Sequence, residues 1–378
     1  METGACPGEK LRHRRRSVCS KTAVAALPPT DAKSRRGSRI HGGVARNQQT
    51  QASAAPFYSL IPWGSLKHYM STTNLSTTAG ASAPSHSEPS PAPEAIVDAT
   101  IEEHRSKPID VLNLNDAEGE LKYLLMLQSS YERTVRDLVS CFAATPRKED
   151  IHVLEIGAYL GVVSVSLRKL GFEVTATELP EFVNNPRLQQ RYASFGIDLV
   201  GANLRHYNLA FPDQHFDAVV MCEVLEHLNF NPLPVIYEIN RVLKPGGLLY
   251  LALPNQVRLR NRLAMLRGKS ALAPIEEFFA QLDRNRNMIV AIHWREYTIA
   301  EVRGILERLG FSVSRQVFFD LSDPVKDGFL LTVAKKILYG AVPSFRPNQV
   351  TFALKASRPH FDFHFCDANS FIDSSRRA

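Results

Sequence analysis

The stretch "VLEIGAYLG", residues 153–161, decides the fold. Its first four residues are mostly apolar, as in a buried strand, and Gly157 and Gly161 bracket the turn that follows. Glycine at such a turn permits a tight bend and lets the backbone approach a ligand closely. Tyr159 stands between the two glycines, where most turns of this kind carry a third glycine. The stretch therefore predicts a strand, a ligand-binding turn with one unusual residue, and a helix.

Strands and helices alternate from residue 151 onward, which is typical of a parallel α/β sheet. The expected strands are 151–157, 173–179, 197–202, 216–224, 248–254, 311–319 and 349–357. The expected helices are 118–142 (one helix or two), 162–171, 186–196, one from Pro232 that "KPGG" (244–247) closes, and one that Thr298 and Glu301 cap. We predict a Rossmann-like, doubly wound, mostly parallel sheet of about seven strands. A helical cap insertion at 255–296 follows the fifth strand.

The start of the chain differs in composition from the rest. Basic runs and a Ser/Pro/Ala-rich stretch cannot bury enough apolar surface to fold, so residues 1–95 are predicted to be a disordered leader. It is interpreted as an organelle transit peptide, a solvated tail, or a start codon placed too early, with Met70 as the internal candidate. An ordered domain is predicted at 96–357 and a tail at 358–378. A cytoplasmic location is expected, with organelle targeting as the alternative.

The net charge of +7 is concentrated in the leader. Residues 1–50 hold 11 basic and 3 acidic residues, whereas the remaining 328 residues hold 34 and 35. A neutral domain argues against nucleic acid as a partner. The five cysteines form no CxxC pair, so neither a disulfide framework nor a zinc knuckle is indicated. No apolar run reaches the roughly 18 residues of a membrane span.

Acidic residues near the turn indicate the kind of cofactor. Glu178 ends the second expected strand, 17 residues after Gly161, where a carboxylate accepts hydrogen bonds from ribose hydroxyls. Glu155 would repel a pyrophosphate and suits a cationic ligand group. S-adenosyl-L-methionine (SAM), which carries an ammonium, a sulfonium and no phosphate, fits this pattern.

Five motifs in order resemble the class I SAM-dependent methyltransferases. They are "VLEIGAYLG", "TELPE", "FPDQHFDAVVMCEVLEHL", "INRVLKPGGLLYLALPN" and "HWREYTIAEVRGILERLGF". The resemblance covers roughly residues 118–357 and is closest to the branch with EVLEH after the fourth strand. It implies a cofactor site of Glu155, Gly157, Tyr159, Gly161, Glu178, Asn203 and Cys222. Asn203 stands where the family usually has an aspartate that faces the adenine amine, and Tyr159 replaces the middle glycine.

The motif EVLEH also carries the candidate catalytic residues. Glu223, Glu226 and His227 would share one face of a helical turn. His227 and Glu223 are the candidate general bases for methyl transfer, with His293 third. His293 and Tyr297 are expected to contact the acceptor.

A metal site is the alternative use of the same residues. Together with His293, the three could bind Mg²⁺ or Mn²⁺, as the resemblance to small-RNA 2′-O-methyltransferases and to metal-dependent quinone-ring O-methyltransferases implies. Since EVLEH also recurs in relatives without a metal, the favoured interpretation assigns none. The arginine-rich insertion is either a cap whose arginines meet an anionic substrate or an amphipathic helix pair with a solvated face.

The sequence thus predicts a SAM-dependent methyltransferase. Its acceptor atom is an oxygen or nitrogen of a small metabolite or glycan-type molecule. The first alternative is a metal-dependent RNA 2′-O-methyltransferase, and the second is a non-catalytic SAM-binding protein. Oligomeric state is left open.

Overall fold

The computed structural model describes residues 91–111, 117–283, 292–320 and 328–359. The predictions for the leader up to residue 90 and for the tail from residue 360 concern residues outside these ranges. Residues 93–95, assigned to the leader, instead belong to the first helix, α1 (Pro93–Ser106). Ile96, Val97 and Ile101 on α1 are buried, so this helix is part of the ordered domain.

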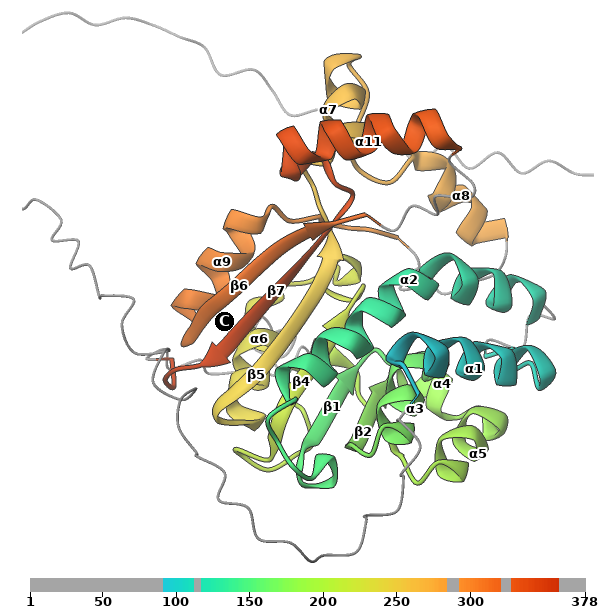
Figure 1. The fold of residues 1–378 in the computed structure, drawn as a ribbon, viewed down its shortest axis with the longest axis vertical. Coiled ribbons are helices and arrows are strands. Elements are labelled where there is room, and N and C mark those ends of the chain that lie inside the picture. The colour runs from blue at the N-terminus through green and yellow to red at the C-terminus, as the bar shows by residue number, and fades with distance from the viewer. Residues whose placement is uncertain (1–90, 112–116, 284–291, 321–327, 360–378) are drawn as a thin grey trace, which may run out of the picture. The chain divides into compact units, whose positions relative to one another are not determined.

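Seven strands form one twisted sheet in the order β3-β2-β1-β4-β5-β7-β6. They are β1 (His152–Ile156), β2 (Glu173–Glu178), β3 (Asp198–Gly201), β4 (Phe216–Cys222), β5 (Leu243–Pro254), β6 (Phe311–Phe319) and β7 (Asn348–Lys355). Strands β3, β2, β1, β4 and β5 pair in parallel with their neighbours in that order, and β7 pairs antiparallel with both β5 and β6 (Figure 1). The predicted doubly wound, mostly parallel sheet is confirmed.

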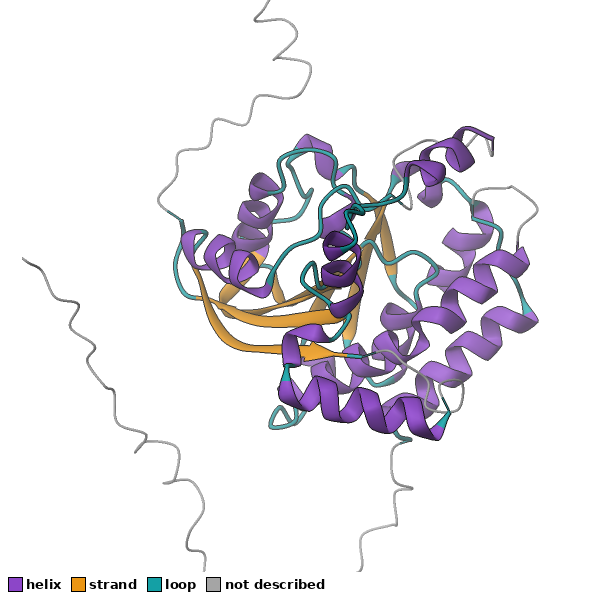
Figure 2. Ribbon diagram, turned by 90° about the horizontal axis from the view of Figure 1, so that it is seen from above, coloured by secondary structure: helices purple, strands orange, loops and turns teal. Residues whose placement is uncertain are grey.

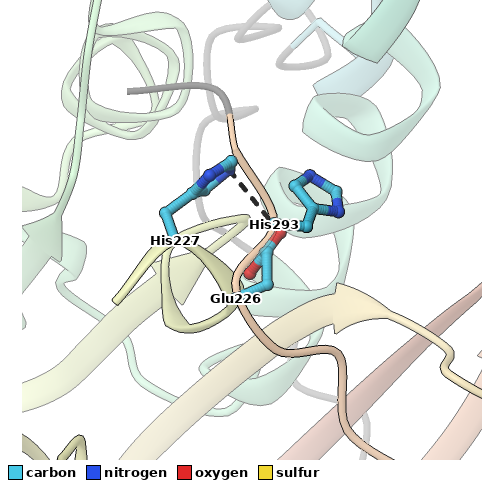
Figure 3. Close-up of side chains that lie close together, drawn as sticks. All are labelled: Glu226, His227 and His293. Carbon is cyan, nitrogen blue, oxygen red and sulfur yellow. Dashed lines mark ion pairs between the residues drawn. The ribbon is translucent and has the colours of Figure 1, made fainter. Parts of the chain in front are cut away.

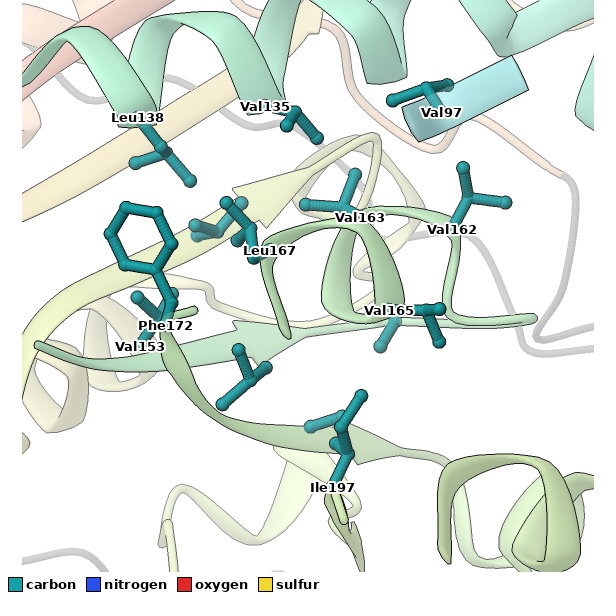
Figure 4. Packing of buried hydrophobic residues seen from close by; sticks show 14 of the residues in the cluster. Val97, Val135, Leu138, Val153, Val162, Val163, Val165, Leu167, Phe172 and Ile197 are labelled. Atoms are coloured by element: carbon teal, nitrogen blue, oxygen red, sulfur yellow. The ribbon is translucent and has the colours of Figure 1, made fainter. Parts of the chain in front are cut away.

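Helices cover both faces of the sheet (Figure 2). One face packs against α1, α2 (Ala117–Cys141), α3 (Val162–Lys169), α4 (Pro180–Val183) and α5 (Pro186–Ser194). Figure 4 shows this layer, where Val135 and Leu138 of α2 meet Val163 and Leu167 of α3 above Val153 of β1. The other face packs against α6 (Leu233–Val242) and α9 (Ile299–Arg308). The central strands are therefore buried on both faces, which explains their nearly continuous apolar sequences.

Several predicted elements need correction. Residues 118–142 form one continuous helix, α2, because its buried positions run on without a break. The segment "KPGG" does not form a separate closing turn but lies within β5, where a register shift against β4 accommodates the two glycines. Helices α1 and α4 were not predicted, since α4 has only four residues and α1, although 14 residues long, is weakly patterned. The predicted cap of α9 is confirmed, because Thr298 and Glu301 exchange hydrogen bonds in a capping box.

The insertion after β5 is helical, as predicted. It contains α7 (Leu259–Leu266) and α8 (Ile275–Asp283), and a third helix, α11 (Phe329–Ala341), joins them from the connection between β6 and β7. The three helices lie together at one end of the sheet (Figure 1). Because β5 and β6 run in the same direction and both end there, this is the carboxyl edge of the parallel strands. Within the described residues, no helix is both long and apolar enough to span a bilayer.

Candidate functional site

The turn after β1 has the backbone conformation that glycine favours. Gly157 has φ of +73°, and a Cβ atom there would come within 2.4 Å of Cγ2 of Val224. Gly161 has φ of +76°, and a Cβ atom there would meet the Tyr192 ring at 2.9 Å. Any other residue at these two positions would force the turn away from its neighbours, so both glycines are fixed by packing as well as by φ.

Tyr159 occupies the same left-handed region, with φ of 49°, which is rare for a bulky residue. Its ring makes edge contacts with Tyr123 of α2 and Phe182 of α4 at centroid distances of 5.5 and 6.0 Å. Its carbonyl accepts a hydrogen bond from Tyr192 Oη at 3.2 Å. These contacts hold the strained turn, and they connect it to α2.

A cavity of about 50 Å³ lies beside the turn, between β1, β4 and α2. Glu155, Gly157 and Tyr159 line it from the turn, Cys222 and Glu223 from the end of β4, and Tyr123 and Tyr131 from α2. This volume holds only one or two water molecules. The side chains of α2 form one wall of this small cavity, and a nucleoside cofactor needs more room than it provides.

Two buried carboxyl groups stand at the ends of adjacent strands. Glu155 accepts hydrogen bonds from Ser164 of α3, but burial raises its pKa to about 7. Glu178 accepts one hydrogen bond, from the Leu179 amide at 3.2 Å, and burial raises its pKa to about 8. A carboxyl this poorly paired gains from donors such as ribose hydroxyls. The donors and acceptors at this edge thus fit the nucleoside and amino-acid parts of SAM.

Cys222 and Asn203 are the other two residues predicted to bind the cofactor. Cys222 lines the cavity with its sulfur 3.8 Å from Thr134 Oγ1, and burial raises its pKa well above the ordinary value. Asn203 follows β3 and caps a short 3-10 turn, where its Oδ1 accepts a hydrogen bond from the Arg205 amide at 3.1 Å. Capping uses one lone pair of this oxygen, so the side-chain NH₂ and the second lone pair of Asn203 Oδ1 remain for a ligand. Its role toward adenine stays a prediction.

A second cluster brings together Glu226, His227 and His293 (Figure 3). One potential ligand atom from each of the three lies within 4.8 Å of the others, and the two imidazole rings meet edge to face at a centroid distance of 4.8 Å. The shared helical face predicted for EVLEH is not found. Glu223 has φ of 53°, and only Leu225–His227 form a helical turn, of the 3-10 type.

Both imidazoles are oriented by hydrogen bonds to one ring nitrogen. Nδ1 of His227 lies 3.0 Å from the carbonyl of Ile292, and Nδ1 of His293 lies 3.3 Å from Oε1 of Glu296. A ring that donates through Nδ1 leaves the lone pair of Nε2 for a proton or a metal ion. Burial, helped by the neighbouring His293, lowers the pKa of His227 to about 4, so His227 is neutral at physiological pH.

The carboxyl groups of the cluster are buried, and Oε1 of Glu226 forms an ion pair with Nε2 of His227 at 4.0 Å when that ring is protonated (Figure 3). Both oxygens of Glu226 and Oε1 of Glu223 have no hydrogen-bond partner among the described residues. Burial, and then the charge of Glu223, raises the pKa of Glu226 well above its usual range, and burial raises that of Glu223 to about 6. Buried carboxylates without hydrogen-bond partners beside two free imidazole nitrogens are the donor set that a divalent cation satisfies. The residues therefore fit a metal ion, and the favoured assignment of none stays a prediction.

Three supporting residues were not predicted. Glu296 receives hydrogen bonds from Arg258 and Asn261 at 2.8 and 2.9 Å as well as from His293. Burial alone would raise the pKa of Glu296, but these bonds and the charge of Arg258 hold it below its ordinary value. The sequence signal that could have identified Glu296 is its position three residues after His293.

Tyr297, predicted to contact the acceptor, is buried in the layer of α6 and α9 and does not line the cavity.

Comparison with known proteins identifies the family. A family model described as "Methyltransferase domain" matches residues 127–316, half of the chain. The chain belongs to the methyltransferase-domain family. The resemblance to SAM-dependent class I methyltransferases is thus confirmed. Membership in the EVLEH branch stays a prediction.

Individual relatives match part of the methyltransferase. It is 34% identical over 153 residues to a protein named ubiquinone biosynthesis O-methyltransferase from Xanthomonas campestris pv. campestris (strain B100), covering 40% of this chain and 60% of that one. A protein of the same name from Xanthomonas oryzae pv. oryzae (strain PXO99A) is 36% identical over 115 residues, with 30% and 47% covered. The chain thus spans less than two thirds of these relatives. A solved SAM-dependent methyltransferase from Aquifex aeolicus is similar with 20% identity and a TM-score of 0.36, covering 57% of this chain and 88% of that one.

Proposed function

We propose that this methyltransferase transfers the methyl group of SAM to a hydroxyl oxygen of a small-molecule acceptor, with a divalent cation at the second cluster. One observation carries the proposal. The Glu226 oxygens, which have no hydrogen-bond partner among the described residues, lie beside the imidazoles of His227 and His293. The two Xanthomonas relatives are also named as O-methyltransferases.

One cluster of residues would bind SAM, and the other would bind the cation and the acceptor hydroxyl. Glu155, Gly157, Gly161 and Glu178 would hold SAM, which supplies the methyl group and its sulfonium leaving group. Glu226, His227 and His293 would hold the cation, which lowers the pKa of a bound hydroxyl. Glu223 lines the cofactor cavity, and its charge raises the pKa of Glu226 after the larger effect of burial, so it is placed between both sites. Its carboxylate would accept the acceptor's proton.

Burial of the cofactor end supports the same assignment. Tyr123 and Tyr131 of α2 line the cavity, whereas the side chains of His227 and His293 are 23% and 34% exposed, so the second cluster is only partly shielded from water. A buried cofactor site keeps the nucleophile near the methyl carbon and in line with the leaving group, which supplies much of the rate in such displacements.

The test uses the full chain with SAM and a panel of phenols and catechols, in Mg²⁺, Mn²⁺ or EDTA. Release of S-adenosylhomocysteine should require the metal, and His293→Ala and Glu226→Gln should abolish turnover while SAM still binds. Glu178→Ala should instead lose SAM binding by at least tenfold, about 1.4 kcal/mol.

Three other outcomes would contradict the proposal. Turnover unaffected by EDTA and by His293→Ala would indicate a metal-free enzyme in which His227 is the base. Preferential methylation of RNA oligonucleotides at a 2′-hydroxyl would indicate the RNA 2′-O-methyltransferase. SAM binding without turnover on any acceptor would favour the non-catalytic protein.

A further inference from the structure

Exposed hydrophobic side chains concentrate in the cap. Eleven of the fifteen large hydrophobic residues that are exposed in the described part of the chain lie between residues 263 and 279 or between 329 and 338. Leu266, Phe329 and Leu330 are 83%, 81% and 82% exposed, close to the value of a side chain in open solvent. Soluble surfaces rarely leave apolar groups so exposed and so close together, so this pattern marks an interaction surface.

On each of two cap helices the apolar residues form a stripe. In α11 the residues Phe329, Val333, Ile337 and Leu330 fall within an arc of about 100° at 100° per residue. In α7 the residues Leu259, Leu263 and Leu266 fall within about 60°. Both helices are therefore amphipathic and direct much of their apolar surface away from the sheet core.

The charges of these two helices have one sign. Residues 256–269 and 328–347 contain eight lysines and arginines and no acidic residue. Arg260 and Arg267 flank the apolar stripe of α7 and, like Lys269 and Lys336, are exposed without a hydrogen-bond or ion-pair partner among the described residues. An apolar stripe bordered by unpaired basic side chains is the pattern of a helix that lies in the interface of an anionic bilayer.

A groove of about 340 Å³ lies between α7 and the segment at and after the end of α11. Arg258, Arg260 and Arg267 line it from α7, together with Tyr339 at the end of α11 and Phe345 beyond it. Arg262 reaches across to Ser344 Oγ at 2.9 Å and lies over the Phe345 ring, so α7 is tied to the 3-10 turn Pro343–Phe345 that follows α11. Two unpaired guanidinium groups beside aromatic rings can receive a phosphate-bearing headgroup.

We propose that α7 and α11 form a docking surface for an anionic phospholipid bilayer, here named the cap face. It comprises the apolar Leu263, Leu266, Phe329, Leu330, Val333 and Ile337 and the basic Arg260, Arg267, Lys269 and Lys336. Helices α7 and α11 lie at the carboxyl edge of the sheet (Figure 1). The cofactor turn follows the end of β1 and Glu226 and His227 follow the end of β4, so both sites lie at the same edge. Docking would therefore turn the catalytic end of the molecule toward the membrane.

The experiment is cosedimentation of the full chain with large vesicles. Vesicles of phosphatidylcholine with about 30% phosphatidylglycerol should bind the protein, and vesicles of phosphatidylcholine alone should bind it at least tenfold less. Leu266→Glu with Phe329→Glu should reduce binding at least tenfold. Arg260→Gln with Arg267→Gln should reduce it about thirtyfold, since each basic side chain at such a surface contributes roughly fivefold. Met126→Glu, which changes a side chain 64% exposed on α2, is the matched control and should bind as the wild type does.

The controls separate this proposal from its rivals. Thermal melts of each variant show whether it is folded, and the assay requires no acceptor, so the result is independent of the proposed activity. Absence of binding would overturn the proposal, as would binding that both double variants retain, since the basic residues 1–50 would then be responsible. Release by inorganic phosphate at constant ionic strength would indicate a site for free phosphate. A dimer in light scattering that Leu266→Glu with Phe329→Glu dissociates would make a second copy the occupant.

Discussion

Glu178 is a buried carboxyl whose proton links stability to cofactor binding. Its folded-state pKa of about 8 lies above the ordinary value of 4.5, so the folded, ligand-free protein keeps a proton that the unfolded chain releases. The stability it contributes is therefore present below about pH 5 and is lost as the pH rises toward 8. Glu155, with a pKa of about 7, acts in the same direction.

Glu178→Gln should consequently have opposite effects on stability and on binding. Without SAM, the variant should be more stable than the wild type near pH 8.5, by roughly 4 kcal/mol, and within about 1 kcal/mol of it near pH 5. SAM affinity should fall at least tenfold. Urea melts at the two pH values and calorimetric titration measure both effects. Glu181→Gln, an exposed neighbour, is the control, and equal pH profiles for wild type and Glu178→Gln would contradict the argument.

Glu296 is a positioning residue that acts through His293. Its carboxylate fixes the ring of His293 and is itself held by Arg258 and Asn261. Glu296→Gln should weaken binding of Mn²⁺ about 10- to 100-fold, the usual cost of losing such a support, and leave SAM binding unchanged. Titration with Mn²⁺ followed by electron paramagnetic resonance measures this directly. Glu276→Gln on α8 should behave as the wild type, and a Glu296→Gln variant with unaltered Mn²⁺ affinity would show that the cluster binds no metal through His293.

At the scale of elements, helix α2 controls access to the cofactor cavity. Its Leu124, Val135 and Leu138 are fully buried against the sheet layer, whereas Tyr123 near its start is 38% exposed and holds the Tyr159 ring. The helix is thus anchored along its length, by Leu124 in its first half and by Val135 and Leu138 in its second, while Tyr123 packs beside the turn. Opening the site requires separation of the Tyr123 and Tyr159 rings.

Tyr123→Ala should therefore speed the association of SAM. An aromatic pair of this geometry contributes about 0.5–1.5 kcal/mol, so the rate should rise roughly 2- to 12-fold. Stopped-flow fluorescence measures the rate, and Tyr123→Phe, which keeps the ring contact, should change it little. An unchanged rate in Tyr123→Ala would place the barrier elsewhere.

At the scale of the whole molecule, stability is unevenly distributed between the sheet and the cap. Strands β1 and β4 are buried on both faces, with Val153, Leu154, Val219 and Val220 at 0% exposure. Helices α7 and α11 keep much of their apolar surface in solvent. Elements with few buried contacts open locally at a lower free energy than the core.

Hydrogen exchange should reflect this difference. Amides of β1 and β4 should exchange by global unfolding, and those of α7 and α11 should exchange at least a thousandfold faster. Mass spectrometry of peptides from the full chain measures both. Anionic vesicles should slow exchange in α7 and α11 and leave β1 unchanged, whereas equal protection of α11 and β4 in solution would contradict the prediction.

The sequence by itself determined the sheet, the turn and the family. Period-two and continuous apolar runs located all seven strands, because burial on one or both faces leaves a local pattern in the chain. Gly157 and Gly161 identified the turn, since only glycine meets its φ values and close contacts at no cost. The capping box of Thr298 and Glu301 is likewise a local signal and was predicted correctly.

The tertiary structure decided what the polar residues do. His227 and His293 are 66 positions apart, and only the fold brings their rings to 4.8 Å and leaves the Glu226 oxygens without hydrogen-bond partners. The cavity wall that α2 forms, burial of Tyr297 and the support from Glu296 depend in the same way on contacts between distant segments. Burial and pairing set the pKa of a carboxyl and the free nitrogen of an imidazole, and neither leaves a periodic trace in the sequence.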